Sequence, residues 1–244
     1  MVEQRNASVA IVGAGDFIGS AIARRFAREG YQLHLARRDG TKLDPLVAEI
    51  AAAGGAATAH SVDARSEEAI TAFLDAANGA APLELVVFNI GANVNFPILE
   101  TTERVFRKVW EMACYAGFLT GREAARHLLA NKGGSIFFTG ATASMRGGSG
   151  YAAFASAKFG LRAVAQSMAR ELGPQNIHVA HLVIDSAVDT AWVRERIEQR
   201  TGAPPPADRL MDPESIAETY WQLHRQPRDA WTHELDLRPA GEPW

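Results

Sequence analysis

The chain has 244 residues, of which 47% are hydrophobic and 22% are charged, and its formal net charge at pH 7 is -3. This size and composition predict one domain over residues 1–244 with a substantial core. The slightly acidic balance argues against nucleic acid and anionic membrane surfaces as partners, so the expected partner is a small-molecule substrate.

The compartment is predicted from what the sequence lacks. Cys114 is the only cysteine, so no internal disulfide or thiolate metal site can form. The first residues are polar and lead into an apolar strand without the apolar segment of a signal peptide. No apolar run approaches the roughly 20 residues of a membrane span. The histidines have no ligand-like spacing, so no metal site is predicted. We expect a cytoplasmic protein.

Short apolar runs alternate with helical patterns along the chain. Strands are predicted at 8–12, 32–36, 57–61, 83–88, 135–139 and 177–184. Helices are predicted at 18–30, 66–79, 104–129 and 148–173, with a further one beginning at Asp212. This alternation predicts a single-domain α/β protein of the Rossmann type, a doubly wound parallel sheet with helices on both faces.

Local signals place several helix ends and one loop. Ser66 and Asp212 are expected to be N-caps, and Pro213 suits the first helical position. The segment 200–210 contains three consecutive prolines, which resist both helix and strand. It is expected to be an exposed connection or a lid, within a substrate-loop region at about 185–211.

A glycine-rich turn joins the first strand to the first helix. Gly13 and Gly15 permit a tight turn whose backbone approaches a pyrophosphate, and Gly19 lets the helix pack close to the sheet. The helix N-terminus offers unpaired N–H groups to the phosphates. The predicted cofactor-binding turn consists of Gly13, Gly15, Asp16, Phe17, Ile18 and Gly19.

With these motifs the chain resembles the short-chain dehydrogenase/reductase family of single-domain Rossmann enzymes. The segment Val62–Ala64 resembles the stretch in which the family's aspartate contacts adenine, Phe88–Gly91 the family's Asn-Asn-Ala-Gly turn, and Val188–Thr190 the stretch that contacts the nicotinamide carboxamide. The resemblance therefore implies further cofactor contacts from Asp63, Ala64, Asn89, Gly91, Val188 and Thr190. It also implies a homodimer or homotetramer.

The residues after the second strand bear on the choice of cofactor. An acidic residue there would accept from the ribose 2′-hydroxyl, but Arg37 stands at that position and Arg38 follows. Guanidinium groups recognise phosphate, which favours NADP(H). Asp16 would repel an added phosphate unless it only caps the first helix, and the arginines could be solvated surface charges. NADP(H) is predicted, with NAD(H) possible.

The resemblance breaks at the catalytic residues. The main line of the family uses a Tyr-x-x-x-Lys pair together with an upstream serine and an asparagine. Lys158 matches the lysine, which in the family also holds the nicotinamide ribose. Phe154, Ala141 and Ala113 occupy the positions of the tyrosine, serine and asparagine.

A neighbouring tyrosine offers a replacement. Tyr151 precedes Lys158 by seven residues, which places both on one helical face. This spacing resembles the Tyr-x-x-Met-x-x-x-Lys motif of the divergent branch represented by enoyl-acyl-carrier-protein reductases, with Phe154 in place of methionine. That branch also lacks the middle glycine of the nucleotide turn, where Phe17 stands here. The chain is thus an atypical member with features similar to that branch.

Three functional hypotheses follow. The leading one is NADP(H)-dependent hydride transfer to a carbonyl or conjugated enoyl group of a small apolar substrate, with Tyr151 and Lys158 as the catalytic pair and Thr142 or Ser144 polarising the substrate oxygen. The second is a catalytically silent NADP-binding sensor or scaffold. The third is carbonyl reduction with Thr142 or Ser144 supplying the proton. The neighbours Met145, Phe96 and Trp192 are expected to make the pocket apolar.

Overall fold

A computed structural model describes residues 4–242. Its main sheet has seven parallel strands in the order β3-β2-β1-β4-β5-β6-β9. They are β1 (Ser8–Val12), β2 (Gln32–Arg37), β3 (Ala56–Ser61), β4 (Leu83–Phe88), β5 (Gly134–Thr139), β6 (Ile177–Ile184) and β9 (Glu234–Leu237). The chain builds outward from β1 in one direction and then from β4 in the other, so the topological switch point lies between these two strands.

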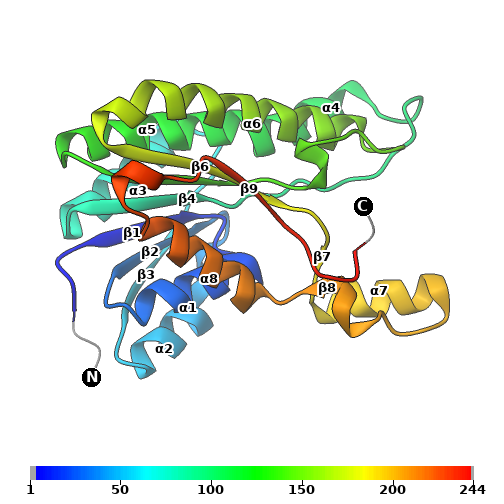
Figure 1. Cartoon of the computed structure of the whole chain (residues 1–244), viewed down its shortest axis with the longest axis horizontal. Helices are drawn as coiled ribbons and strands as arrows, with labels where there is room; N and C mark the ends of the chain where they lie inside the picture. The colour runs from blue at the N-terminus through cyan, green and yellow to red at the C-terminus, as the bar shows by residue number, and fades with distance from the viewer. Residues whose placement is uncertain (1–3, 243–244) are drawn as a thin grey trace.

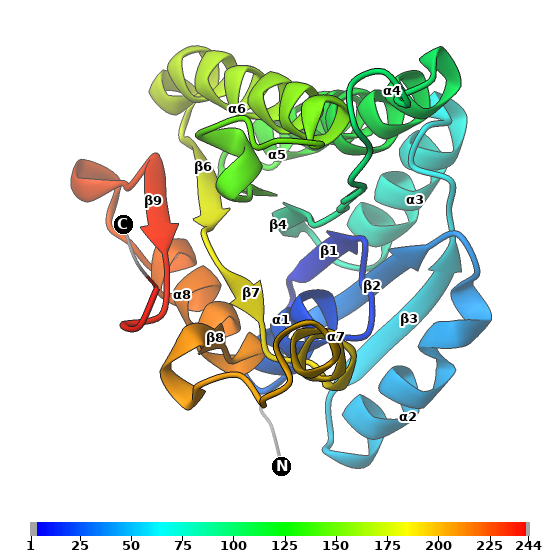
Figure 2. The same cartoon turned by 90° about the vertical axis from the view of Figure 1, so that its right-hand side faces the viewer.

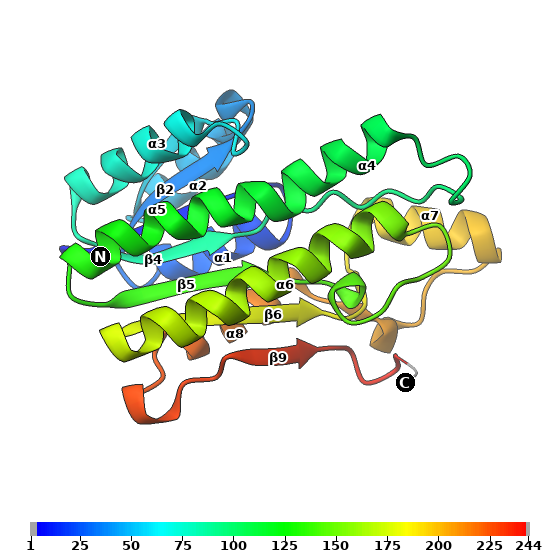
Figure 3. The ribbon, with the colours of Figure 1, turned by 90° about the horizontal axis from the view of Figure 1, so that it is seen from above.

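Helices cover both faces of this sheet, as predicted. One face carries α1 (Ile18–Ala27), α2 (Asp44–Ala52) and α8 (Pro213–His224), and the other carries α3 (Glu67–Ala80), α4 (Glu103–Trp110), α5 (Ala116–Ala130) and α6 (Ala152–Leu172) (Figure 1; Figure 3). Each face has its own apolar core, because the buried strands present aliphatic side chains in both directions. The fold class is therefore confirmed.

A smaller substructure stands beside the carboxyl ends of the strands. It consists of a two-stranded sheet, β7 (Ala187–Val188) with β8 (Leu210–Met211), and of α7 (Ala191–Thr201) (Figure 2). The sequence patterns did not predict β7, β8 or β9. Two-residue strands carry no periodicity, and Glu234–Leu237 alternates polar and apolar residues at a sheet edge where only one neighbour, β6, pairs with it.

The predicted helix caps are confirmed at two sites. The Ser66 side chain accepts from the backbone N–H of Ala69 at 3.2 Å, and the Asp212 side chain accepts from the N–H of Glu214 at 2.9 Å. The predicted long helix at 104–129 is continuous, but residues Glu111–Tyr115 form a π-helical segment between α4 and α5. Within residues 4–242, no helix is both long and apolar enough to cross a bilayer.

Candidate active site

The glycine turn after β1 is held by β4. Gly13 adopts a φ of 91°, and a Cβ added there would lie 2.9 Å from the backbone carbonyl carbon and oxygen of Asn89. The Asn89 amide Nδ2 donates to the Gly13 carbonyl at 3.0 Å. Asn89 therefore braces the turn at the switch point, where Rossmann folds bind dinucleotides.

The two following glycines have different surroundings. A Cβ on Gly19 would lie 2.5 Å from the Gly13 carbonyl oxygen and 2.8 Å from the Ala14 Cα, whereas a Cβ on Gly15 meets nothing within 4 Å. Gly19 thus lets α1 pack against the turn, and Gly15 leaves the space above it open.

This contrast yields a paired prediction. We expect Gly19→Ala to lower the free energy of unfolding by about 1 to 3 kcal/mol, because the backbone atoms that it meets cannot move aside cheaply. Gly15→Ala should leave stability nearly unchanged but weaken cofactor binding, because its methyl group projects where a pyrophosphate approaches the turn. Thermal unfolding and NADPH titration of both variants test this. Unchanged cofactor affinity in Gly15→Ala would contradict it.

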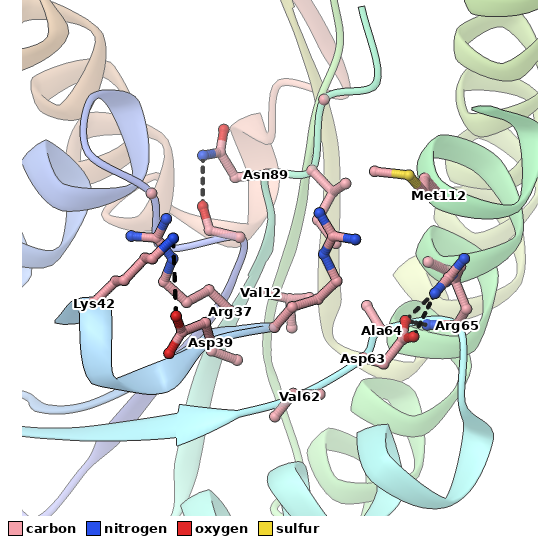
Figure 4. Close-up of a pocket in the computed structure, with 17 residues that line it drawn as sticks. Val12, Arg37, Asp39, Lys42, Val62, Asp63, Ala64, Arg65, Asn89 and Met112 are labelled. Atoms are coloured by element: carbon pink, nitrogen blue, oxygen red, sulfur yellow. Dashed lines mark hydrogen bonds and ion pairs between the residues drawn. The ribbon is translucent and has the colours of Figure 1, made fainter. Parts of the chain in front are cut away.

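A pocket lies beyond the ends of β1, β2 and β4, and basic side chains line one side of it. Figure 4 shows Arg37 and Lys42 together on this side, and Arg38 also lines the pocket. On the opposite side Asp63 accepts from the Arg65 guanidinium at 2.9 and 2.6 Å, which holds the pKa of Asp63 below its ordinary value. Ala64 lies between them and is buried.

Asp16 does not cap α1, in contrast to one expected role. The N-cap of α1 is Phe17, which receives no side-chain cap, and Asp16 Oδ1 instead accepts from Arg37 Nη1 at 3.1 Å. Their charges compensate each other, so Asp16 removes part of the positive charge of this pocket. Phe17 is 48% exposed and, with Ile18, lines the adjoining cleft.

A larger cleft of about 1320 Å³ continues from the glycine turn along β5 and α6. At its base, Lys158 is fully buried, and its Nζ donates to the carbonyls of Thr139 at 2.8 Å and Ile90 at 3.1 Å. An ammonium has three N–H donors, so one remains for a ligand in the cleft. Burial lowers the pKa of Lys158 to about 8. Gly91 also lines this cleft.

Tyr151 and Phe154 line the same cleft beside Lys158. Tyr151 is the N-cap of α6 and not a residue of its first turn, so the seven-residue spacing spans the helix start. The phenol makes no hydrogen bond with any residue among 4–242. The Phe154 ring is largely buried, with its centroid 6.0 Å from Lys158 Nζ. The tyrosine predicted to act and the phenylalanine at the position predicted for the family's tyrosine therefore line one cleft.

The hydroxyl residues after β5 differ in what they can reach. Thr142 lines the cleft. Ser144 is fully buried, and its Oγ accepts from the backbone N–H of Ala141 at 3.1 Å, so it stabilises the turn. Thr139 shares a hydrogen bond of 2.6 Å with the Tyr220 hydroxyl. Of these three residues, only Thr142 both lines the cleft and has a hydroxyl without a hydrogen-bond partner among the described residues.

Residues 13–232 match a protein-family model described as enoyl-(acyl carrier protein) reductase. The chain belongs to the short-chain dehydrogenase/reductase family. It is 28% identical over 214 residues to the 3-oxoacyl-acyl-carrier-protein reductase MabA of Mycobacterium tuberculosis, covering 86% of this chain and 82% of that protein. Among solved structures, a short-chain dehydrogenase from Rhodopseudomonas palustris is 61% identical with a TM-score of 0.84, covering 96% of this chain and 99% of that chain.

A metagenomic short-chain oxidoreductase solved in complex with NADP is also similar, at 27% identity and a TM-score of 0.80, covering 96% of this chain and 98% of that chain. The short-chain dehydrogenase/reductase cleft seen here fits a nicotinamide cofactor. The open space at Gly15 and the start of α1 suit its pyrophosphate, and the remaining donor of Lys158 suits its ribose.

Part of the segment 185–211, which was predicted to be a substrate loop, lines the cleft. Val188 and three consecutive prolines, Pro204, Pro205 and Pro206, line the cleft. Thr190 instead caps α7 by accepting from the N–H of Val193 at 3.1 Å. Of the residues expected to make the pocket apolar, Tyr151 lines the cleft. Met145, Phe96 and Trp192 are not among its lining residues, and the latter two are exposed.

Sequence analysis missed several lining residues. Asp39, Lys42, Arg65 and Met112 line the pocket beyond β2, and Asn93, Arg146, Arg209 and Glu242 line the cleft. Only the run Arg37–Arg38 next to Lys42 offered a local signal. The others come from loops and helix ends that the tertiary structure brings together.

A group of possible cation ligands lies elsewhere, on α3 and α5. Oxygen and nitrogen atoms of Asp75, Glu123 and His127 fall within 4.8 Å of one another. His127 Nε2 lies 3.2 Å from Asp75, and Glu123 pairs with Arg126 at 2.9 Å. The contact between His127 and Asp75 and the ion pair of Glu123 with Arg126 account for the cluster, and we assign no metal to it.

Proposed function

We propose that this protein is an NADP(H)-dependent reductase that adds hydride to a carbonyl or conjugated enoyl group. The observation that carries the proposal is the buried Lys158 ammonium, which has one donor left and lies at the base of a cleft that Tyr151 and Thr142 also line. Such a site can bind a cofactor ribose and supply a proton at the same place.

The residues have separate roles in this proposal. Lys158 holds the ribose and stabilises negative charge nearby, while the Ile90 and Thr139 carbonyls fix its Nζ. Tyr151 donates its phenolic proton to the substrate oxygen as negative charge develops there. Thr142 donates a hydrogen bond to the same oxygen, and Ser144 shapes the turn that presents Thr142. The nicotinamide, when bound, supplies the hydride.

Similarity to known reductases narrows the class of substrate. The relative MabA is named for reduction of a 3-oxoacyl group and the matching family model for reduction of an enoyl group, both on an acyl carrier. Hydride addition to a carbonyl carbon places negative charge on the oxygen bonded to it, and addition to an enoyl group places the charge on the conjugated carbonyl oxygen. A tyrosine and a threonine can stabilise either oxyanion. We favour reduction of a carbonyl group, because the relative MabA is named for reduction of a 3-oxoacyl group.

The basic side of the pocket beyond β2 supports NADP(H). Arg37 is partly neutralised by Asp16 at 3.1 Å and Lys42 by Asp39 at 3.8 Å, so Arg38 provides most of the charge available to a 2′-phosphate. We expect Arg38→Ala to lower kcat/KM for NADPH by roughly tenfold to a hundredfold and to leave that for NADH nearly unchanged. Arg28→Ala, which removes the same charge from the surface outside this pocket, is the control. Equal loss with both cofactors would contradict the assignment.

The proposed function is tested by oxidation of NADPH and NADH by the purified protein with a panel of ketones, aldehydes and enoyl thioesters. Reduced product in stoichiometric amount supports it. The competing hypothesis, a silent NADP-binding sensor or scaffold, is favoured by the buried Phe154 at the usual tyrosine position. Tight NADPH binding without turnover of any panel member would establish that alternative.

We also propose a homodimer or homotetramer built on α4, α5 and α6. This face exposes large apolar side chains that a monomer would leave in water. They are Phe106, Trp110, Phe118, Leu129 and Phe159, each 39% to 42% exposed. Sedimentation equilibrium of the wild type beside Phe159→Glu would test the assignment, since a buried carboxylate would dissociate such an interface.

A further inference from the structure

The cleft is more basic than an apolar substrate requires. Arg146, Arg200 and Arg209 line it, together with two carboxylates, Glu242 and Asp16, of which Asp16 pairs with Arg37. The three arginines come from separate elements: the loop before α6, the end of α7, and the short helix Ala207–Arg209. Separate segments thus bring like charges to one opening, at an electrostatic cost that a bound anion would relieve.

The two arginines from the loop region have no ionic partner. Among the residues that the structure describes, neither the Arg200 nor the Arg209 guanidinium forms an ion pair, and both residues are exposed. Other arginines of this region are engaged. Arg194 makes a bidentate pair with Asp189 at 2.5 Å, and Arg196 lies over the Trp192 ring at 5.1 Å from its centroid.

The third arginine is only partly neutralised. Arg146 Nη2 lies 3.5 Å from Oδ1 of Asp185, which is buried after β6. The other oxygen of that carboxylate is bound by Arg238. One carboxylate is therefore shared between two guanidinium groups, and net positive charge remains. On the other side, Glu242 Oε2 accepts from the Ser186 hydroxyl at 3.3 Å.

From this arrangement we infer that the substrate carries an anionic group, a carboxylate or a phosphate, that binds Arg200 and Arg209 while its reducible group lies beside Tyr151. The inference rests on the proposed reductase function. Guanidinium groups bind both anions through paired N–H donors. The anion belongs either to the substrate itself or to a phosphorylated carrier such as coenzyme A, and substrate pairs separate these two sources.

The test compares kcat/KM within two pairs of substrates. One pair is 4-benzoylbutanoate and its methyl ester, and the other is a 3-oxoacyl coenzyme A thioester and the N-acetylcysteamine thioester of the same acyl group. We expect at least one anionic member to be preferred by about tenfold or more, consistent with a charge-assisted hydrogen bond. The preferred pair identifies the source. Raising the ionic strength to about 0.5 M should shrink that preference.

Three variants locate the effect. Arg200→Gln and Arg209→Gln should each raise KM for the anionic substrate by roughly tenfold, with kcat and NADPH affinity retained. The neutral member should be unaffected. Arg196→Gln removes the same charge from the same helix outside the cleft and should behave as the wild type.

The outcomes separate the two proposals. Equal kcat/KM for the members of both pairs would overturn the anionic substrate and leave the reductase standing. Absence of turnover with all four compounds would count against the reductase, and calorimetric titration of the NADPH complex with the same compounds would then decide the inference. Equal affinity for charged and neutral members in that titration would overturn it as well.

Discussion

Tyr151→Phe is expected to lower kcat by roughly 10²- to 10⁴-fold while NADPH still binds, which is the range that a positioned general acid contributes. The variant removes one oxygen from the wall of the cleft, and the phenol has no structural hydrogen bond to lose within the described chain. Stopped-flow or steady-state NADPH oxidation measures the loss, and quenching of protein fluorescence measures cofactor binding.

The matched control is Tyr115→Phe. Tyr115 lies in the π-helical segment outside the cleft and stacks near Trp110 and Phe118, so removal of its hydroxyl should leave kcat unchanged. A nearly silent Tyr151→Phe would contradict our assignment. It would favour Thr142, which lines the same cleft, as the proton donor.

Introducing a tyrosine at position 154 tests whether a phenol near Lys158 is what the reaction requires. Phe154 also lines the cleft, and its ring lies 6.0 Å from Lys158 Nζ. We expect Phe154→Tyr to restore part of the activity lost in Tyr151→Phe, because a phenol one helical turn along the same wall can reach the same ammonium. Rescue would distinguish loss of a proton donor from loss of packing.

Replacement of Lys158 has the other large expected effect. Lys158→Met should lower kcat/KM by about a thousandfold or more, since it removes both the remaining donor of Nζ and a buried positive charge beside the site. NADPH affinity should fall by roughly tenfold to a hundredfold. Lys108→Met, on the exposed surface of α4, is the control. Retained turnover in Lys158→Met would overturn the catalytic pair.

The same variant tests the effect of burial on Lys158. Its pKa is about 8 in the folded protein, below the ordinary 10.5, so between these values the unfolded chain binds more protons. The free energy of unfolding of the wild type, relative to Lys158→Met, should therefore rise as pH increases from about 8 to 10.5, by up to about 3 kcal/mol. Urea unfolding of both proteins across this range measures it. If the difference in unfolding free energy between the two proteins did not change with pH, the Lys158 ammonium would not be desolvated in the folded protein.

Much of the fold could be predicted from local patterns. The six strands β1 to β6 are apolar enough to be recognised as buried, and Ser66 and Asp212 mark helix starts by short-range hydrogen bonds. The cofactor turn could be located because Gly13, Gly15 and Gly19 fall between one apolar strand and the helix that follows it. These features depend on residues close in sequence, or on one strand and the helix that follows it.

The sequence by itself therefore determined the parallel sheet and the glycine turn, and it predicted that Tyr151 and Lys158 act together. Only the tertiary structure decided that Asp16 pairs with Arg37, that Ser144 is buried in a turn and does not line the cleft, and that Arg146, Arg200 and Arg209 do line it. The physical reason is the distance along the chain over which the deciding contacts form. Helix and strand formation follow contacts over a few residues, whereas the charge of a cleft depends on loops that the fold brings together from distant parts of the chain.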